Sequence, residues 1–211
     1  MNDTQRQFIR ALESNSKAFG ISLSAEKVFN LAKYYELVCK HNDVLHLVAP
    51  SPPETFAVRH VLESLFAEKF LPKNASFADI GTGAGLPSVP LLIAREDTRG
   101  FLVESKLKKG EFLQEVLAEC KLSNRAEILN RQFEELPKPD ISYVLCRALD
   151  KFTQKLPKLL KWSDNCSLLF FGGNTLRDEL QKCRVKFDEK LLPLSERRFL
   201  FVFSKNYYRK E

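Results

Sequence analysis

The segment of residues 77–97, FADIGTGAGLPSVPLLIARED, holds Asp79 followed by Gly81, Gly83 and Gly85. Glycine has no Cβ, so a backbone with alternating glycines can turn sharply and approach a ligand closely. Apolar residues precede and follow the glycines, which predicts a strand, a tight loop and a helix. This arrangement is typical of loops that bind nucleotide-like ligands, and several cofactors share it.

The spacing of the glycines narrows the choice of ligand. A Walker phosphate loop closes with Lys and Ser or Thr, whereas Leu86 and Pro87 stand here. A dinucleotide loop, Gly-x-Gly-x-x-Gly, would need a glycine in place of Leu86. The observed Gly-x-Gly-x-Gly therefore favours a ligand without a pyrophosphate. Asp79 is expected to meet a cationic end of that ligand, directly or through water.

A second acidic residue, Glu104, ends the next expected strand, 23 residues after Gly81. A carboxylate at this place can accept hydrogen bonds from both ribose hydroxyls. Together these features fit S-adenosylmethionine, which carries ribose and adenine but no phosphate. The alternative interpretation is a plain glycine turn with an ordinary surface glutamate.

Apolar spacing predicts helices in the N-terminal third of the chain. Ser24 is suited to cap a helix whose buried stripe comprises Val28, Leu31, Ala32, Tyr35, Val38 and Cys39. After a proline-rich turn a second helical stripe follows, comprising Val58, Val61, Leu62, Leu65, Phe66 and Phe70. We predict that residues 1–71 form a helical extension packed on the core.

From residue 72 onward, expected strands and helices alternate. The expected strands are residues 76–80, 100–104, 126–130, 141–146, 167–173 and 197–204. A helix is expected at 86–95, and another begins after Ser105 as its cap. This alternation predicts an α/β core over residues 72–211, with a mostly parallel sheet of about seven strands covered on both faces.

Composition limits the class of protein. The 211 residues, 44% of them hydrophobic, suffice for one sizeable domain with a buried core. The first twenty residues are too polar for a signal peptide, and no apolar stretch is long enough to span a membrane. Five cysteines without a CxxC pair suit a reducing cytosol, and three histidines lack metal-ligand spacing. We expect a cytoplasmic protein without metal or membrane partners, and its net charge of +6 favours a polyanion.

The chain resembles the glucose-inhibited division protein B family over about residues 31–205. The resemblance rests on DIGTGAGLPSVPL, LVESKLKKGEFL, the pair Arg59-His60 in FAVRHVLESL, and Arg147-Ala148 in CRAL. Members of that family are bacterial S-adenosylmethionine-dependent methyltransferases that modify guanine N7 in 16S ribosomal RNA. The resemblance implies a Rossmann-like methyltransferase fold, S-adenosylmethionine as cofactor, and ribosomal RNA or the small ribosomal subunit as partner.

The resemblance also implies cofactor contacts. The family has an Arg-x-Glu stretch whose last two residues lie against the adenine, and RQFEELP corresponds to it here. When the acids and Pro137 are aligned, Phe133 and Glu134 take the adenine positions, while Arg131 stands one residue early. The expected cofactor site therefore comprises Asp79, Gly81, Gly83, Gly85, Leu86, Glu104, Phe133, Glu134 and Arg147.

Basic and polar residues near these elements are expected to contact RNA. Contacts to phosphate would position the RNA and make its binding salt-dependent. The candidates are Arg59, His60, Lys108, Lys109, Arg147 and Arg198. One departure from the family concerns the substrate: Gly172-Gly173 follows the fifth expected strand, where the family usually carries Lys-Gly. The missing lysine removes a contact to RNA phosphate.

Guanine N7 carries a free lone pair at the major-groove edge of the base. Methylation there removes no proton beforehand, so an enzyme needs positioning rather than a general base. No catalytic residue is assigned, and Arg147 is expected near the reacting centre. The first hypothesis is a guanine-N7 methyltransferase of 16S ribosomal RNA. The alternatives are a methyltransferase of another RNA or a small molecule, a non-catalytic RNA-binding protein with this fold and, last, a nicotinamide dehydrogenase.

Overall fold

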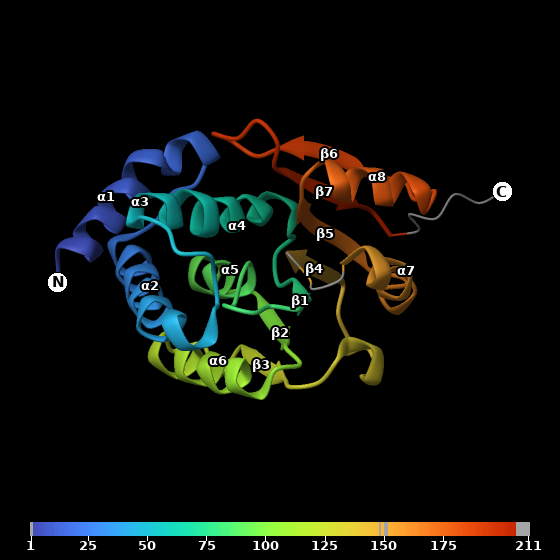
Figure 1. Ribbon diagram of the computed structural model, residues 1–211, viewed down its shortest axis with the longest axis horizontal. Coiled ribbons are helices and arrows are strands. Elements are labelled where there is room, and N and C mark those ends of the chain that lie inside the picture. Colours follow the sequence, from blue (N-terminus) through green and yellow to red (C-terminus); the bar gives the residue numbers. More distant parts are fainter. Residues whose placement is uncertain (1, 148, 150–151, 206–211) are drawn as a thin grey trace.

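The computed structural model describes residues 2–147, 149 and 152–205. Its centre is a seven-stranded sheet in the order β3-β2-β1-β4-β5-β7-β6 (Figure 1). The strands are β1 (Ser76–Ile80), β2 (Arg99–Val103), β3 (Ala126–Leu129), β4 (Tyr143–Arg147), β5 (Ser167–Gly172), β6 (Asp188–Leu191) and β7 (Phe199–Phe203). The predicted α/β class and number of strands are confirmed.

Strands β1 to β5 run parallel, and β7 runs antiparallel to both β5 and β6. Asp79 on β1 lies in register with Leu102 on β2 and with Leu145 on β4. The chain builds the sheet outward from β1 in both directions, so the strand order reverses between β1 and β4. Open α/β sheets bind ligands outside the carboxyl ends of their strands at such a point, and the glycine loop follows β1 there.

Helices cover both faces of the sheet (Figure 1). Successive side chains of a strand point to opposite faces, so Phe77 packs in one hydrophobic cluster and Ala78 in the other. The first face is covered by α1 (Asp3–Ser16), η1 (Lys17–Phe19), α2 (Ala25–Leu45), the helical segment 53–70, α5 (Ser88–Ala94) and α6 (Leu107–Glu119). The second is covered by η4 (Phe133–Glu135), α7 (Phe152–Trp162) and α8 (Asn174–Lys182). Burial on both faces explains why β1, β2, β4 and β5 are mostly apolar.

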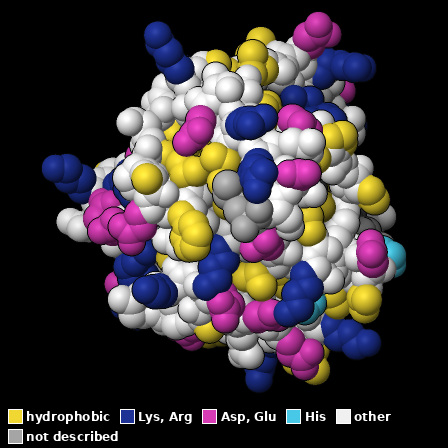
Figure 2. Space-filling view, turned by 90° about the vertical axis from the view of Figure 1, so that its left-hand side faces the viewer, with side chains coloured by type: hydrophobic (Ala, Val, Ile, Leu, Met, Phe, Trp, Pro, Cys, Tyr) yellow, Lys and Arg dark blue, Asp and Glu magenta, His cyan; other side chains and the backbone are white. Residues whose placement is uncertain are grey.

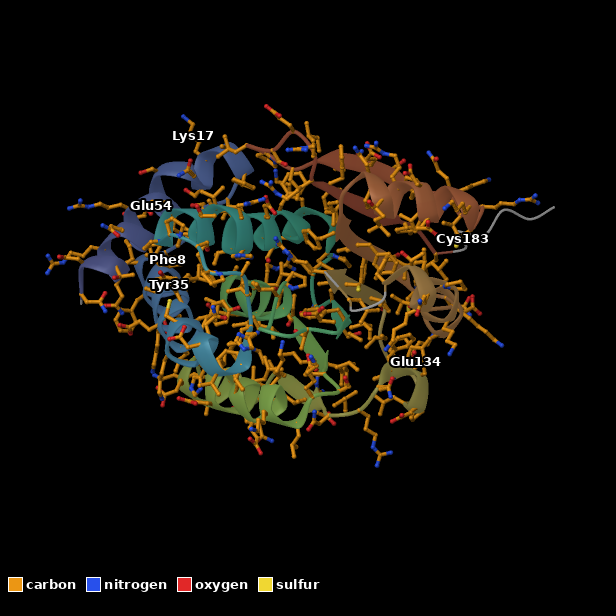
Figure 3. The ribbon with its side chains drawn as sticks, viewed as in Figure 1. Phe8, Lys17, Tyr35, Glu54, Glu134 and Cys183 are labelled. Atoms are coloured by element: carbon orange, nitrogen blue, oxygen red, sulfur yellow. The ribbon has the colours of Figure 1, made fainter. Side chains whose placement is uncertain are left out.

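The N-terminal helices pack on the sheet through the predicted apolar stripes. The Ser24 side chain accepts a hydrogen bond from the Lys27 amide at 3.3 Å, so the expected cap of α2 is confirmed. The ring of Phe8 on α1 stacks on Tyr35 of α2 with centroids 4.6 Å apart (Figure 3). The stripe residues of α2 are buried up to Val38, whereas Cys39 is exposed.

A continuous helical path from residue 53 to residue 70 leads into the sheet. It consists of α3 (Pro53–Phe56), the π-helical η2 (Ala57–Leu62), α4 (Glu63–Leu65) and η3 (Phe66–Phe70). The predicted domain division at residues 71–72 falls between η3 and β1. Side chains of this path share one hydrophobic cluster with the sheet.

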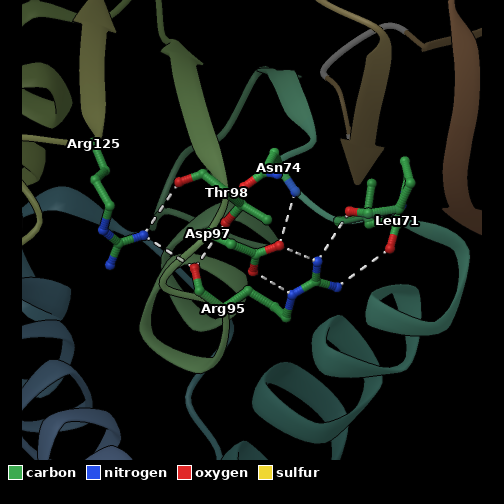
Figure 4. Close-up of polar contacts among 7 residues, drawn as sticks. Leu71, Asn74, Arg95, Asp97, Thr98 and Arg125 are labelled. Atoms are coloured by element: carbon green, nitrogen blue, oxygen red, sulfur yellow. Dashed lines mark hydrogen bonds and ion pairs between the residues drawn. The ribbon is translucent and has the colours of Figure 1, made fainter.

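A polar network joins the connections at the amino edge of the sheet (Figure 4). Asp97 accepts hydrogen bonds from Arg95 Nε at 2.7 Å and from the Asn74 amide at 2.8 Å. Arg95 also donates to the Leu71 carbonyl, and Arg125 donates to the Arg95 carbonyl. Because Asn74, Asp97 and Arg125 closely precede β1, β2 and β3, the network aligns the starts of three strands. It lies at the edge opposite the glycine loop.

One local prediction is wrong, and one strand was not predicted. Ser105 does not cap α6, because the residue at the cap position is Lys106 and it makes no side-chain capping bond. Strand β6 was not expected: its sequence, DEKL, has no apolar alternation, and all four residues are exposed. It forms at the edge of the sheet by pairing with β7, a long-range interaction that its own sequence does not signal.

The surface formed by α1 and α2 is mixed in charge. Figure 2 shows Lys and Arg side chains interspersed with Asp and Glu over this face. The positive charge expected to attract a polyanion is therefore not concentrated here. Among the residues described, no helix combines the length and hydropathy needed to cross a membrane.

Candidate cofactor pocket at the carboxyl edge of the sheet

A pocket of about 400 Å³ lies at the carboxyl edge of the sheet, beside the glycine loop. Five residues of the expected cofactor site line it: Gly81, Gly83, Leu86, Glu104 and Arg147. Besides Arg147, which was also expected to contact RNA, two further RNA candidates line it: His60 and Lys109. Lys106 and Lys155 line it as well. The structure thus brings together residues from η2, from the loops after β1 and β2, and from β4, α6 and α7.

Two glycines of the loop serve different purposes. Gly83 has φ +56°, and a Cβ built on it would have no neighbour nearer than the Gly81 carbonyl oxygen at 3.8 Å. A side chain at Gly83 would therefore extend into the pocket rather than into the core. Gly85 has φ +90°, and a Cβ there would lie 2.5 Å from Val89 Cγ2. Gly85 allows the loop to pack against α5 and does not itself line the pocket.

Glu104 fixes the loop from the end of β2. Its Oε2 accepts a hydrogen bond from the Gly83 amide at 3.0 Å, and its Oε1 accepts one from the Lys106 amide at 2.8 Å. Asn130 Nδ2 donates to the Glu104 carbonyl at 2.6 Å. Glu104 is only 6% exposed, so its carboxylate is not an ordinary surface group. The alternative of a plain turn with a surface glutamate does not describe this arrangement.

Asp79 lies behind the loop and does not line the pocket. It is fully buried, and its Oδ2 accepts hydrogen bonds from Thr82 Oγ1 at 2.7 Å and from the Ser88 amide at 3.2 Å. Burial raises the pKa of Asp79 to about 7, and the two hydrogen bonds oppose that rise. Its side chain links the start of the loop to the first turn of α5. Its expected contact with a cationic ligand end, directly or through water, stays a prediction.

Helix α2 supports the loop through Tyr34. This side chain is fully buried, and its hydroxyl donates to the Ala84 carbonyl at 2.9 Å, 50 residues along the chain. The bond satisfies a polar group in the middle of the glycine loop, where a buried carbonyl without a partner would be costly. The N-terminal helices therefore position the loop directly.

Arg147, at the end of β4, is held by the helical path 53–70. Its guanidinium donates to Glu63 Oε2 at 3.1 Å, to Ser64 Oγ at 3.3 Å and to the Arg59 carbonyl at 2.5 Å. Glu63 Oε1 also accepts from Arg198 Nε at 2.6 Å. The side chain of Glu63 is 1% exposed. Arg198 is thus linked to the pocket residue Arg147 through Glu63. Ala148, the second residue of the expected Arg147-Ala148 pair, lies outside the described residues.

The other expected RNA contacts differ in exposure. Arg59 and Lys108 are exposed, whereas Lys109 is partly buried and donates to the His46 carbonyl at 3.4 Å. Burial, with smaller effects from nearby arginines, lowers the pKa of His60 to about 4. His60 therefore borders the pocket as a neutral imidazole at neutral pH.

The two residues expected to lie against the adenine are connected to the pocket by Lys155. Phe133 is 2% exposed and packs edge-on against Trp162, with ring centroids 6.0 Å apart. Glu134, on η4 beside α7, pairs with Lys155 at 3.7 Å (Figure 3). Lys155 lines the pocket, whereas Phe133 and Glu134 do not. Their contact with a ligand stays a prediction.

Several residues of the site were missed by the sequence analysis: Tyr34, Glu63, Thr82 and Lys155. Tyr34 lies outside the apolar stripe predicted for α2, although it is buried in the structure. Glu63 and Arg147 are 84 residues apart. No local spacing marks such partners. Across the described ranges, no cluster of His, Cys, Asp or Glu is arranged to hold a metal ion.

The sheet order and the pocket beside a glycine loop are those of the Rossmann-like methyltransferase fold. A solved structure, the ribosomal protein L11 methylase from Lactobacillus delbrueckii, has the same fold with a TM-score of 0.55. It is 12% identical, and the match covers 70% of this chain and 78% of that one. At that identity the likeness concerns the fold alone.

The model of the glucose-inhibited division protein B (GidB) family, described as rRNA small subunit methyltransferase G, matches residues 27–196. The chain belongs to this family, as the resemblance implied. A ribosomal RNA small subunit methyltransferase G from Dichelobacter nodosus is 30% identical, over 97% of this chain and 99% of its own length. The protein of that name from Aliarcobacter butzleri is 36% identical over 68% of this chain and 73% of its own length.

Proposed function

We propose that this protein transfers a methyl group from S-adenosylmethionine to N7 of a guanine in 16S ribosomal RNA. The observation that carries the proposal is the pocket in which the Gly83 amide meets the Glu104 carboxylate beside Arg147. Membership of the rRNA small subunit methyltransferase G family supports the ribosomal substrate. With ribosomal RNA as substrate, alone or within the small ribosomal subunit, we expect the reaction to take place in the cytoplasm.

The residues present fit the proposed cofactor. Open space above Gly83, where a Cβ would have no close neighbour, gives room for a ligand against the backbone. Glu104 can accept hydrogen bonds from ribose hydroxyls, and Leu86 offers an apolar contact. Lys106, Lys109 and Arg147 can hold the carboxylate of an amino acid. When bound, S-adenosylmethionine supplies an electrophilic methyl group on a sulfonium.

The pocket also suits a reaction that needs no general base. Guanine N7 already presents its lone pair, so the protein has to orient two partners rather than remove a proton. The lowered pKa of His60 keeps its imidazole neutral at neutral pH, so it adds no positive charge beside a base that becomes cationic. Arg147 is held in one orientation and can fix an acceptor group in the pocket.

The departure at Gly172-Gly173 has a packing reason. A Cβ at Gly172 would lie 2.5 Å from Leu176 Cδ2 and 2.8 Å from Leu176 Cβ. A lysine at Gly172 would therefore require α8 to move. We infer that exposed residues such as Arg59 and Lys108 contribute the phosphate contacts instead.

The test is a modification map of ribosomal RNA from cells with and without the gene. Loss of one N7-methylguanosine in 16S ribosomal RNA, restored by the purified protein and S-adenosylmethionine, is the expected result. An unchanged map, with methyl transfer to another RNA or a small molecule, would favour the second function. If the protein binds RNA without S-adenosylmethionine and transfers no methyl group, the result would favour a non-catalytic RNA-binding protein.

A further inference from the structure

Glu63 is a buried carboxylate between two arginines from distant parts of the chain. Its Oε2 lies 3.1 Å from Arg147 Nη2 and its Oε1 lies 2.6 Å from Arg198 Nε. These partners are 84 and 135 residues away in the sequence. With 1% of its side chain exposed, Glu63 does not line the pocket itself, whereas its partner Arg147 does.

Stability alone is a weak explanation for such a group. Removing a carboxylate and a guanidinium from water is costly, and packed apolar residues often stabilise a core as well or better. The arrangement instead restricts one side chain at the pocket wall. Arg147 donates to Ser64 Oγ and to the Arg59 carbonyl from the same guanidinium, whose Cζ lies 5.5 Å from the Phe171 ring. Contacts with the helix and with β5 together fix the plane of the guanidinium.

We propose that Glu63 is a positioning residue that holds the Arg147 guanidinium in its working orientation in the cofactor pocket. The inference deepens the proposed function and rests on it where methyl transfer is concerned. Arg198 completes the arrangement by pairing with the second carboxylate oxygen, which prevents Glu63 from turning away from Arg147. Glu63 touches neither cofactor nor RNA in this role.

A double-mutant cycle tests whether Glu63 acts through Arg147. Glu63→Asp keeps the charge but withdraws the carboxylate by one methylene, and Glu63→Gln keeps the size but removes the charge. Each is made in the parent and in Arg147→Ala, and affinity for S-adenosylhomocysteine is measured by calorimetry. We expect each Glu63 variant to weaken binding by about fivefold or more in the parent and by less than about twofold in Arg147→Ala.

Asp97→Asn provides the matched control. It removes the charge of another carboxylate paired with an arginine, but at the opposite edge of the sheet (Figure 4). We expect it to lower the melting temperature without changing the affinity for S-adenosylhomocysteine. Since Glu63→Asp retains a charge for both arginines, it should remain folded even if Glu63→Gln does not.

Single-turnover methylation at saturating RNA and cofactor gives the second readout, with the same pattern expected in the rate constant. Equal losses of affinity in both backgrounds, or no loss in the parent, would overturn the role of Glu63. If the parent binds S-adenosylhomocysteine but leaves 16S ribosomal RNA unmethylated, the proposed function fails. The affinity cycle then still decides the role of Glu63, because it uses no RNA.

Discussion

The Gly83 amide donates a hydrogen bond to Glu104 Oε2 across 3.0 Å, although the two residues are 21 positions apart. One is the middle glycine of the loop after β1, and the other follows β2. Parallel pairing of these strands brings their carboxyl ends together, which is why the contact can form. The same carboxylate can therefore fix the loop and face a ligand.

Replacing Glu104 with alanine should affect both binding and stability. The amides of Gly83 and Lys106 would lose their acceptor. We expect cofactor affinity to fall by roughly 1.5–3 kcal/mol, the range for hydrogen bonds to charged groups. Calorimetry with S-adenosylmethionine and thermal melting check these effects. Glu111→Ala on the exposed side of α6 is the control, and equal affinities for both variants would contradict the prediction.

Gly83→Val should abolish cofactor binding while leaving a folded protein. The branched side chain would enter the pocket, where its Cβ meets no protein atom closer than 3.8 Å. Positive φ also strains a non-glycine residue, at a cost of about 1–2 kcal/mol. Gly20→Val controls for that strain, because Gly20 has φ +66° and does not line the pocket. Measurable S-adenosylmethionine binding by Gly83→Val at parental affinity would show that the loop is not the site.

Tyr34→Phe should loosen the glycine loop. It removes the donor to the Ala84 carbonyl and leaves that group without the bond, at a cost of about 1–3 kcal/mol. We expect a lower free energy of unfolding and weaker S-adenosylmethionine binding. The control is Tyr35→Phe on the same helix, which keeps the stacked ring against Phe8 and leaves the loop untouched. Cofactor affinity that falls equally in both variants would argue against a special role for Tyr34.

Asp79 should make stability depend on pH. Its pKa is about 7 in the folded protein and 3.8 ordinarily, so between about pH 4 and pH 7 the folded state retains a proton that the unfolded state has lost. The free energy of unfolding therefore falls as pH rises through that window, by at most ~1.4 kcal/mol per pH unit. Asp79→Asn can keep both accepted hydrogen bonds through its carbonyl, and it should remove this dependence.

Urea unfolding at pH 5, 6, 7 and 8 measures the effect of Asp79. We expect the difference in stability to shift steadily in favour of Asp79→Asn as the pH rises. Titrating groups that do not interact with Asp79 cancel in that difference. Parallel stability curves for the two proteins would rule out titration of Asp79 in this range.

Lys108→Ala should weaken RNA binding without affecting the cofactor. Lys108 is exposed and does not line the pocket. If it contacts a phosphate, its removal should reduce RNA affinity regardless of sequence and flatten the salt dependence by about one counterion. Filter binding of 16S ribosomal RNA at several salt concentrations measures both, with Lys121→Ala beyond α6 as the control. If the slope of RNA affinity against salt concentration is unchanged, Lys108 does not belong to the RNA-binding surface.

Local sequence patterns were enough to predict the glycine loop and the strand end at Glu104, both of which line the candidate cofactor pocket. Alternating glycines after an apolar run predict the loop after β1, because the left-handed φ values found at Gly81, Gly83 and Gly85 are readily adopted by glycine. The acid at Glu104 could be placed at the sheet edge because consecutive parallel strands end on the same side. Such signals depend on residues that are close together in the sequence, so they can be recognised without the tertiary structure.

The tertiary structure decided which polar groups turn inward and which reach the pocket. Asp79 lies within β1 and Glu104 directly follows β2, yet one lies behind the loop and the other lines the pocket. Strand β6, with the sequence DEKL, exists because β7 offers it free backbone groups. Glu63 acquires its partners across 84 and 135 residues. These outcomes depend on packing between segments distant in sequence, where residue type alone does not specify the partner.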